Sequence, residues 1–219
     1  MDTLNSFLAV MHSRGLHLPY VYDIGACSGR WASSMKEGPL WRSDFWLFEA
    51  NSAYKSELEK TGFRFYIETL SNPGRDYATF FKKTNTGDSY YKETTKHFDD
   101  AVADIHKCIT LDKMIEENDI PVANFVKMDT QGSELDILAG ASKVVGKAAF
   151  FYVECPIIKY NAGAPSFTDY TDFFLDNNYV PVNLFEIHRG EDILTQVDIL
   201  FMRRDVKEAF LSKTEMIRI

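Results

Sequence analysis

Apolar residues recur along the chain at two spacings, one typical of helices and one typical of buried strands. Leu4, Phe7, Leu8 and Met11 lie three or four positions apart, which predicts an amphipathic helix that ends near Gly15. Short runs rich in β-branched and aromatic residues predict strands at residues 21–24, 44–49, 63–70, 124–129 and 148–154. Between them, more polar stretches predict helices after Gly29 and at residues 55–60, 109–117, 135–141 and 167–177.

The alternation of strands and helices is typical of an α/β fold with a parallel sheet. Two further apolar runs, at residues 179–187 and 197–202, are separated by a polar stretch that includes His188-Arg-Gly-Glu-Asp. This connection is short enough for an antiparallel hairpin. We therefore expect a seven-stranded, mostly parallel sheet with one antiparallel strand near its edge.

Residues 76–108 are less regular than the rest of the chain. Residues 77–83 and 89–93 favour a β-ribbon around Asn85-Thr-Gly-Asp, followed by a polar connection at residues 94–106. We interpret residues 76–108 as an insertion over a cleft. With residues 1–15 as an N-terminal helix and no linker or internal repeat, residues 1–219 are expected to form a single domain.

Composition narrows the range of functions. The formal net charge of -8 argues against a general nucleic-acid binder, which needs a basic face for the phosphates. Three cysteines without a C-x-x-C pair fit reduced thiols better than a disulfide framework or a zinc site. No apolar run approaches the roughly 18 residues of a membrane span, and the N-terminus lacks a signal sequence. We expect a cytoplasmic protein.

The strongest local motif joins the first predicted strand to the helix after it. Asp23-x-Gly25-x-x-x-Gly29 forms a strand, a glycine turn and a helix, the unit that presents a helix N-terminus to a nucleotide-like ligand. Asp23 is placed to accept from a ligand amine or hydroxyl. Dinucleotide-binding proteins have G-x-G-x-x-G instead, and Cys27 stands where their middle glycine would be. A plain strand-to-helix turn is the alternative interpretation.

Four predicted strands end on an acid, namely Asp23, Glu49, Asp129 and Glu154. Ligands of open α/β sheets bind beyond the carboxyl ends of the strands, and buried carboxylates are costly unless they are paired. Glu49 is placed to accept from both hydroxyls of a ribose, although a surface glutamate at a strand end is the alternative. The loop after the third strand would border an adenine, which makes Leu70 and Ser71 candidates for a base pocket.

Several motifs together resemble the FkbM-type methyltransferases, a family of class I S-adenosylmethionine (SAM) methyltransferases. They are Val21-Tyr-Asp-Ile-Gly-Ala-Cys-Ser-Gly-Arg30, Phe48-Glu-Ala-Asn51, Ile109-Thr-Leu-Asp112, Val126-Lys-Met-Asp-Thr-Gln-Gly-Ser-Glu-Leu-Asp-Ile-Leu-Ala-Gly-Ala141 and Tyr152-Val-Glu154. They cover roughly residues 20–155 in the order of the family. Gln131 departs from the pattern, because many members carry an acid there. Neither the segment after Pro156 nor residues 76–106 belong to the motifs.

The resemblance implies a three-layer αβα, Rossmann-like fold and SAM-dependent O-methylation of a hydroxyl, often on a sugar, with S-adenosylhomocysteine (SAH) as the product. The implied cofactor-binding residues are Asp23, Gly25, Ala26, Cys27, Gly29, Glu49, Ala50, Asn51, Leu70, Ser71 and Asp129. Asp129 is the first candidate for the base that takes the hydroxyl proton, Glu154 the second, and Lys127 is expected on the same strand face as a partner for a carboxylate.

Other roles and other functions stay open. Glu134 suits the first turn of a helix as a cap or a catalytic acid, and His188 is a base only if its turn folds over the cleft. Asp129 and Glu154 could hold a divalent cation, but no third ligand is evident, so we expect no metal. The alternative functions are an NAD-dependent oxidoreductase and a non-catalytic subunit with a SAM-binding fold. The acceptor is expected to be a small molecule or glycan, and the oligomeric state is open.

Overall fold

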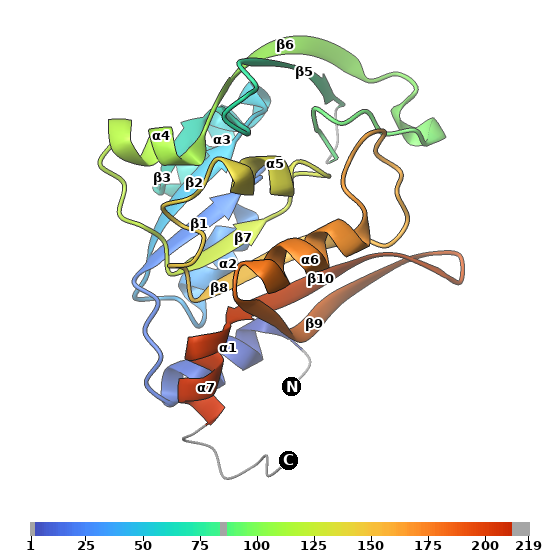
Figure 1. Ribbon diagram of the computed structural model, residues 1–219. Coiled ribbons are helices and arrows are strands. Elements are labelled where there is room, and N and C mark those ends of the chain that lie inside the picture. Colours follow the sequence, from blue (N-terminus) through green and yellow to red (C-terminus); the bar gives the residue numbers. More distant parts are fainter. Residues whose placement is uncertain (1–2, 84–86, 212–219) are drawn as a thin grey trace.

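The structure is a computed structural model that describes residues 3–83 and 87–211. Its centre is a sheet of seven strands in the order β3-β2-β1-β7-β8-β10-β9 (Figure 1). Five of them run parallel, whereas β10 runs antiparallel to both of its neighbours. The predicted fold class is confirmed. The strands are β1 (Tyr20–Ile24), β2 (Asp44–Glu49), β3 (Arg64–Ile67), β7 (Phe125–Met128), β8 (Phe150–Pro156), β9 (Tyr179–Gly190) and β10 (Ile193–Arg203).

Helices cover both faces of this sheet and complete three layers. One apolar cluster joins the sheet to α4, α5 and α6, and a second joins its other face to α1, α2 and α3. None of the helices in the described part of the chain has both the length and the apolar character that a bilayer span requires. The helices are α1 (Leu4–Ser13), α2 (Arg30–Glu37), α3 (Lys55–Thr61), α4 (Leu111–Glu117), α5 (Glu134–Ala139), α6 (Phe167–Asp176) and α7 (Arg204–Leu211), with two 3-10 turns, η1 (Ser52–Tyr54) and η2 (Lys96–Phe98).

The parallel strands read as apolar runs because both of their faces are covered. All four residues of β7 are buried, and in β2 only the first residue is exposed. Parallel pairing brings the carboxyl ends of β1, β2, β7 and β8 to the same edge of the sheet. The acids that end these strands, which include Glu49, Asp129 and Glu154, therefore come together there.

The predicted third strand, residues 63–70, is two strands in the structure. β3 pairs with β2 in the large sheet, and β4 (Thr69–Leu70) pairs with β6 (Val102–Ile109) in a small sheet of order β4-β6-β5. The break falls at Glu68, whose N–H donates to the carbonyl of Glu49 at 2.9 Å. Leu70 and Ser71 consequently belong to the small sheet and the loop that follows it.

The predicted ribbon partner within residues 76–108 was wrong. β5 (Tyr77–Lys82) pairs with β6, whereas residues 89–93 form isolated bridges alone, from Ser89 to Phe81 and from Glu93 to Asn161. The segment assigned to a polar connection contains a strand that was missed because half of β6 is exposed and only Cys108 is buried. Asp104 on β6 forms an ion pair with Lys82 on β5. Residues 84–86 of the predicted turn, like residues 1–2 and 212–219, lie outside the described part of the chain. That residues 76–108 are an insertion stays a prediction.

Candidate active site

The turn between β1 and α2 is held between the ends of two neighbouring strands. Gly25 has a φ of 74°, and a Cβ built on it would lie 1.9 Å from the carbonyl oxygen of Asp129, after β7. Only glycine fits such an approach. On the other side, the N–H groups of Gly25 and Ala26 donate to the carbonyl of Phe48 in β2, at 2.9 and 3.1 Å. The glycine in the motif is therefore required by the packing of the turn against the sheet itself.

Glu49, at the end of β2, fixes the backbone around this turn. Its carboxylate accepts from the N–H of Cys27 and from the N–H of Asn51, both at 2.7 Å. Burial raises the pKa of Glu49 above its ordinary value, although these two hydrogen bonds oppose the shift. An ionised carboxylate has about four acceptor positions, so two remain for hydroxyl groups of a ligand.

Lys127 is buried under the turn, with its ammonium group between two carboxylates. Its Nζ lies 2.9 Å from the carbonyl of Gly25, 3.2 Å from Asp23 Oδ1 and 3.6 Å from Asp129 Oδ2. Burial by itself would lower the pKa of Lys127, but the charges of Asp23 and Asp129 raise it above its ordinary value. The predicted pairing with a carboxylate is thus present, and a lysine held in its charged form cannot act as a base.

Asp129 and Glu154 are linked by the side chain of Gln131. Its Nε2 donates to Asp129 Oδ1 at 3.0 Å and also to Glu154 Oε2. Burial, together with the charges of Asp129 and Asp198, raises the pKa of Glu154 well above its ordinary value. The residue that departs from the family pattern therefore supplies a neutral bridge between two acids, where a third carboxylate would add repulsion.

A second set of polar side chains surrounds Glu154 from the C-terminal part of the chain. Gln196, in β10, donates to Glu154 Oε1, and Tyr160 donates to Gln196 Oε1. His188, near the end of β9, lies at the same rim, 3.8 Å from the carboxylate of Glu186. His188 therefore lines the cavity from a strand and not from the predicted turn.

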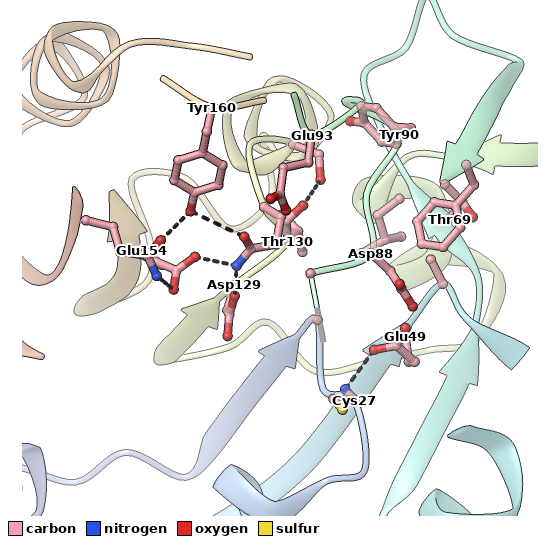
Figure 2. A pocket seen from close by; sticks show the side chains of 18 of the residues that line it. Cys27, Glu49, Thr69, Asp88, Tyr90, Glu93, Asp129, Thr130, Glu154 and Tyr160 are labelled. Carbon is pink, nitrogen blue, oxygen red and sulfur yellow. Dashed lines mark hydrogen bonds between the residues drawn. The ribbon is translucent and has the colours of Figure 1, made fainter. Parts of the chain in front are cut away.

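These groups line one cavity of about 580 Å³, within the range of about 300–1,000 Å³ typical of small-molecule sites. Figure 2 shows Asp129, Glu154 and Tyr160 at one end and Cys27, Glu49 and Asp88 at the other. Thr130 and Glu93 line the same cavity. The residues of the prediction that line the cavity are Gly25, Cys27, Glu49, Ala50, Leu70, Asp129, Glu154 and His188.

Six predicted site residues lie behind the cavity wall instead of on it. Asp23 is fully buried and faces Lys127, so it is not placed to accept from a ligand in this structure. Gly29 packs near side chains of α3 and β2, and Asn51 donates to Asp88 and caps η1. The residues of this group, all of them buried, are Asp23, Ala26, Gly29, Asn51, Ser71 and Lys127. They shape the site without forming its surface.

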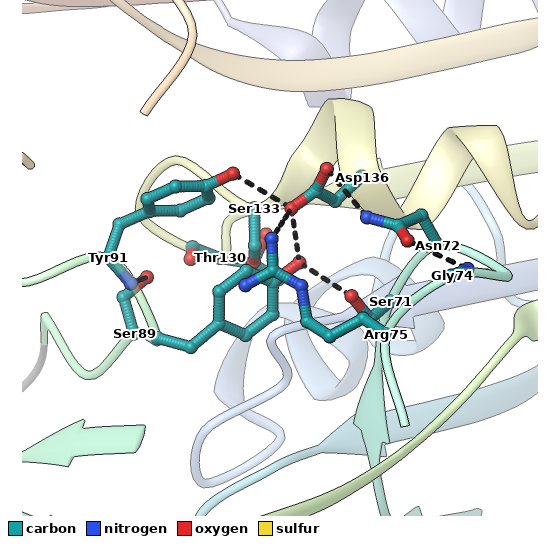
Figure 3. A network of polar contacts seen from close by, with 10 residues as sticks. Ser71, Asn72, Gly74, Arg75, Ser89, Tyr91, Thr130, Ser133 and Asp136 are labelled. Atoms are coloured by element: carbon teal, nitrogen blue, oxygen red, sulfur yellow. Dashed lines mark hydrogen bonds and ion pairs between the residues drawn. The ribbon is translucent and has the colours of Figure 1, made fainter. Parts of the chain in front are cut away.

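Asp136, on α5, ties two loops to the same edge of the sheet (Figure 3). Its carboxylate accepts from Asn72 at 3.0 Å and from Arg75 at 3.0 Å. The hydroxyls of Tyr90 and Tyr91 donate to it at 3.2 and 2.8 Å. Because Tyr90 lines the cavity, this network fixes one wall of it. Ser71, predicted to border a base, is in contact with Tyr90 at 3.3 Å instead.

Glu134 has a structural role in the loop after β7. It is completely buried and accepts from the N–H groups of Thr130 and Gly132 at 2.7 and 3.0 Å, while Tyr170 donates to it as well. Burial raises its pKa above the ordinary value. All of these contacts shape the loop that carries Gln131, and Glu134 is not part of the cavity surface.

The sequence did not point to Tyr54, Asp88, Tyr160 or Gln196, all of which line the cavity. Tyr54 comes three residues after the Phe48-Glu-Ala-Asn51 motif, and this closeness was the signal in the sequence that could have placed it at the site. Gln196 and Asp198 alternate with apolar residues along β10. This alternation indicates that they share one face of the strand, but it does not indicate which residues lie opposite that face. Tyr160 lies in a loop and carried no signal.

A family model described as the methyltransferase FkbM domain matches residues 23–181. No curated protein matches the chain. Among solved structures, the FkbM methyltransferase from Methylobacillus flagellatus KT is 15% identical with a TM-score of 0.55, over 90% of this chain and 48% of that chain. The present chain therefore spans about half the length of that protein.

Two other solved structures share the fold at lower identity. The magnesium protoporphyrin IX methyltransferase ChlM from Synechocystis PCC 6803, with bound SAM, is 10% identical with a TM-score of 0.51, over 91% of this chain and 77% of that one. A fibrillarin/Nop5p complex gives 12% identity and a TM-score of 0.52, over 90% and 80%. At such identities these likenesses concern the fold alone. The family model, however, matches well over half of the sequence, and the chain belongs to the FkbM methyltransferase family.

Proposed function

We propose that this protein is a SAM-dependent O-methyltransferase that transfers a methyl group to a hydroxyl of a sugar, a glycan or a related polar small molecule. The observation that carries the proposal is the continuity of one cavity, from the glycine turn and Glu49 to Asp129 and Glu154. Methyl transfer needs a donor and an acceptor in line in one space. Membership of the FkbM family supports the same reaction.

The donor end fits SAM by the chemistry of its residues. Glu49 keeps acceptor positions for a ribose diol. Gly25 has no side chain that would obstruct a ligand at the turn. Ala50, Leu70 and Phe80 give an apolar wall to the same part of the cavity, which suits the flat face of an adenine. When bound, SAM supplies an electrophilic methyl group on a sulfonium.

The acceptor end is lined by groups that bind hydroxyls. Gln131, Glu154, Tyr160, Thr195 and Gln196 all border the cavity, and such a set of donors and acceptors suits a polyol better than an apolar acceptor. Orientation of the reacting groups supplies on the order of 7–11 kcal/mol of a barrier. These side chains orient the acceptor hydroxyl by hydrogen bonds, which is the main contribution this reaction needs.

Asp129 takes the hydroxyl proton in this proposal. Its side chain is 42% exposed towards the cavity, and Lys127 lies 3.6 Å from Oδ2. Gln131 holds the other oxygen at 3.0 Å, so the carboxylate is fixed in direction. Glu154, with a pKa raised by burial and by neighbouring acids, holds a second hydroxyl of the acceptor. Lys127 acts only by positioning Asp23, Asp129 and the turn at Gly25.

Binding and turnover test this function separately. We expect the protein to bind SAH by calorimetry, to show no affinity for NAD, and to transfer labelled methyl from SAM to a hydroxyl within a panel of sugars and polyols. Binding of NAD in place of SAH would support the oxidoreductase alternative. SAH binding without turnover on any acceptor, in a protein whose Asp129→Asn variant behaves identically, would support the non-catalytic subunit.

A further inference from the structure

Three neighbouring strands each contribute one side chain of a metal-ligating type beside the cavity, and two of these side chains, Glu154 and His188, line it. The three are Glu154 on β8, Asp198 on β10 and His188 on β9, and one ligand atom of each lies within 4.8 Å of the others. Across the described residues, no second group of three such side chains converges in this way. The cluster differs from the pair of Asp129 and Glu154, which Gln131 already bridges.

The sheet itself brings these residues together. Asp198 is the direct cross-strand partner of Glu154, and His188 is the partner of Gln196, two residues away from Asp198 on the same face of β10. The pairing of β9 with β10 shifts register between Val197 and Ile199, and such irregularities redirect side chains at the edges of sheets. The convergence therefore rests on backbone pairing and not on the chance position of long side chains.

Each candidate ligand is also held by an outer partner. The carboxylate of Glu154 accepts from Gln131 on one oxygen and from Gln196 on the other. His188 lies 3.8 Å from Glu186, and the hydroxyl of Tyr152 hydrogen-bonds to Asp198. Partners of this kind orient ligands in metal sites, where a histidine typically has a carboxylate on its second nitrogen and ligating carboxylates accept further hydrogen bonds.

One oxygen of the cluster lacks a partner. Asp198 Oδ1 is buried without a hydrogen bond to any protein group, and an unpaired buried carboxylate oxygen is costly. Glu154 and Asp198 face each other as like charges, with Glu186 close by. The imidazole of His188, which can carry the opposite charge, lies near Asp198. A cation would satisfy the free oxygen and offset the repulsion.

We propose that Glu154, His188 and Asp198 bind a single divalent transition-metal cation. One imidazole nitrogen with two carboxylates is a donor set of the kind that Zn²⁺, Mn²⁺ or Co²⁺ accepts, whereas Mg²⁺ and Ca²⁺ prefer oxygen alone. Three protein ligands also leave positions for other oxygens, as in catalytic metal sites. Because Glu154 lines the acceptor end, a hydroxyl of the acceptor is the group suited to such a position; this consequence rests on the proposed function.

Co²⁺ is the probe of choice, because its visible absorption reports ligand number and type. We expect the full chain, stripped of metal by a chelator, to bind one equivalent of Co²⁺ by absorption and calorimetry. His188→Ala and Asp198→Asn should each weaken binding by about tenfold or more. Both changes are mild for the fold, because His188 is exposed and asparagine keeps the shape of Asp198.

His17→Ala is the matched control. His17 lies before β1, at the opposite end of the sheet, against the ring of His12, so loss of Co²⁺ binding in this variant would assign the metal to that pair and overturn the proposal. Absence of binding to the wild type at 100-fold excess of Co²⁺, or unchanged affinity in both His188→Ala and Asp198→Asn, would overturn it too. SAH binding, measured in parallel with a chelator present, separates the two proposals. Co²⁺ binding without SAH binding would support the metal site and contradict the proposed function. SAH binding without Co²⁺ binding would support the proposed function and overturn the metal site.

Discussion

The two ends of the cavity are built in different ways. At the donor end the contacts involve backbone: Gly25 lies against the carbonyl of Asp129, and Glu49 accepts from two N–H groups. At the acceptor end the contacts join side chains, such as Gln131 with Glu154 and Gln196 with Glu154. The geometry of the donor end is therefore fixed by the backbone of the sheet, whereas the geometry of the acceptor end depends on which side chains are present.

This difference suggests which part of the site is constrained by the shared fold and which part can differ in sequence. A donor end held by backbone tolerates few changes at its glycine and its carboxylate. We expect single substitutions among residues 131, 154, 160 and 196 to change the acceptor preference without changing the sheet, because the contacts of these residues at the acceptor end involve side chains. We therefore expect substitutions at the donor end to act on cofactor affinity and those at the acceptor end to act on turnover.

The largest effect is expected from Gly25→Val. Its Cβ would lie 1.9 Å from the carbonyl oxygen of Asp129, so the turn must move away from the end of β7, and SAH affinity should fall by about a hundredfold or more (more than about 2.7 kcal/mol). Calorimetry on a sample shown to be folded by circular dichroism measures it.

Gly62→Val is the control for this change. Gly62 also has a positive φ, of 73°, but nothing lies within 4 Å of a Cβ at that position. It carries the same backbone strain without the collision, and its SAH affinity should stay within about twofold of wild type. Equal loss of affinity in both variants would show that strain, and not the close approach of β7, controls the donor end.

Asp129→Asn should have the next largest effect, on turnover alone. Asparagine can still accept from Gln131, but it cannot take a proton, and loss of a general base lowers the rate by about 10²–10⁴-fold. SAH affinity should change by less than about threefold, because Glu49 and the turn remain. Single-turnover transfer of labelled methyl gives the rate. Asp44→Asn, an exposed acid at the opposite end of β2, should keep the wild-type rate; weakened SAH binding with a retained rate in Asp129→Asn would reverse the assignment.

The sequence predicted the donor end better than the acceptor end for the same physical reason. Motifs such as Asp23-x-Gly25 and Glu49-Ala-Asn51 are local, and the strand pattern states which edge of the sheet they reach. Gln196 and Glu154 are 42 residues apart in the sequence. Their contact requires the antiparallel pairing of β10 with β8, and no local sequence pattern predicts the register of that pairing. Strand β6 escaped prediction because its apolar residues do not form one buried face: Val102 and Ile105 are exposed, and Cys108 is its one buried residue.

Gln131→Glu should disturb the acceptor end more moderately. The amide of Gln131 donates to Asp129 and to Glu154, and a glutamate would place a third negative charge between two carboxylates. We expect kcat/KM to fall by about tenfold, which corresponds to roughly 1.4 kcal/mol of transition-state stabilisation. Steady-state kinetics with the best acceptor measures the fall, and SAH affinity serves as the internal control. An unchanged kcat/KM would mean that the bridge does not position Asp129.

The smallest effect concerns the pH dependence of SAH affinity. Burial raises the pKa of Glu49 above its ordinary value, and a ribose diol donates best to the ionised form. Because a fall in pH protonates Glu49, SAH affinity should be highest at pH 8 and decline towards pH 5, by no more than about tenfold per pH unit for one proton. Glu49→Gln, which cannot ionise, should bind SAH more weakly at every pH and show no such slope in calorimetry. A slope of equal size in Glu49→Gln would assign the titration to another group of the cavity and would leave the backbone-held donor end independent of the charge of Glu49.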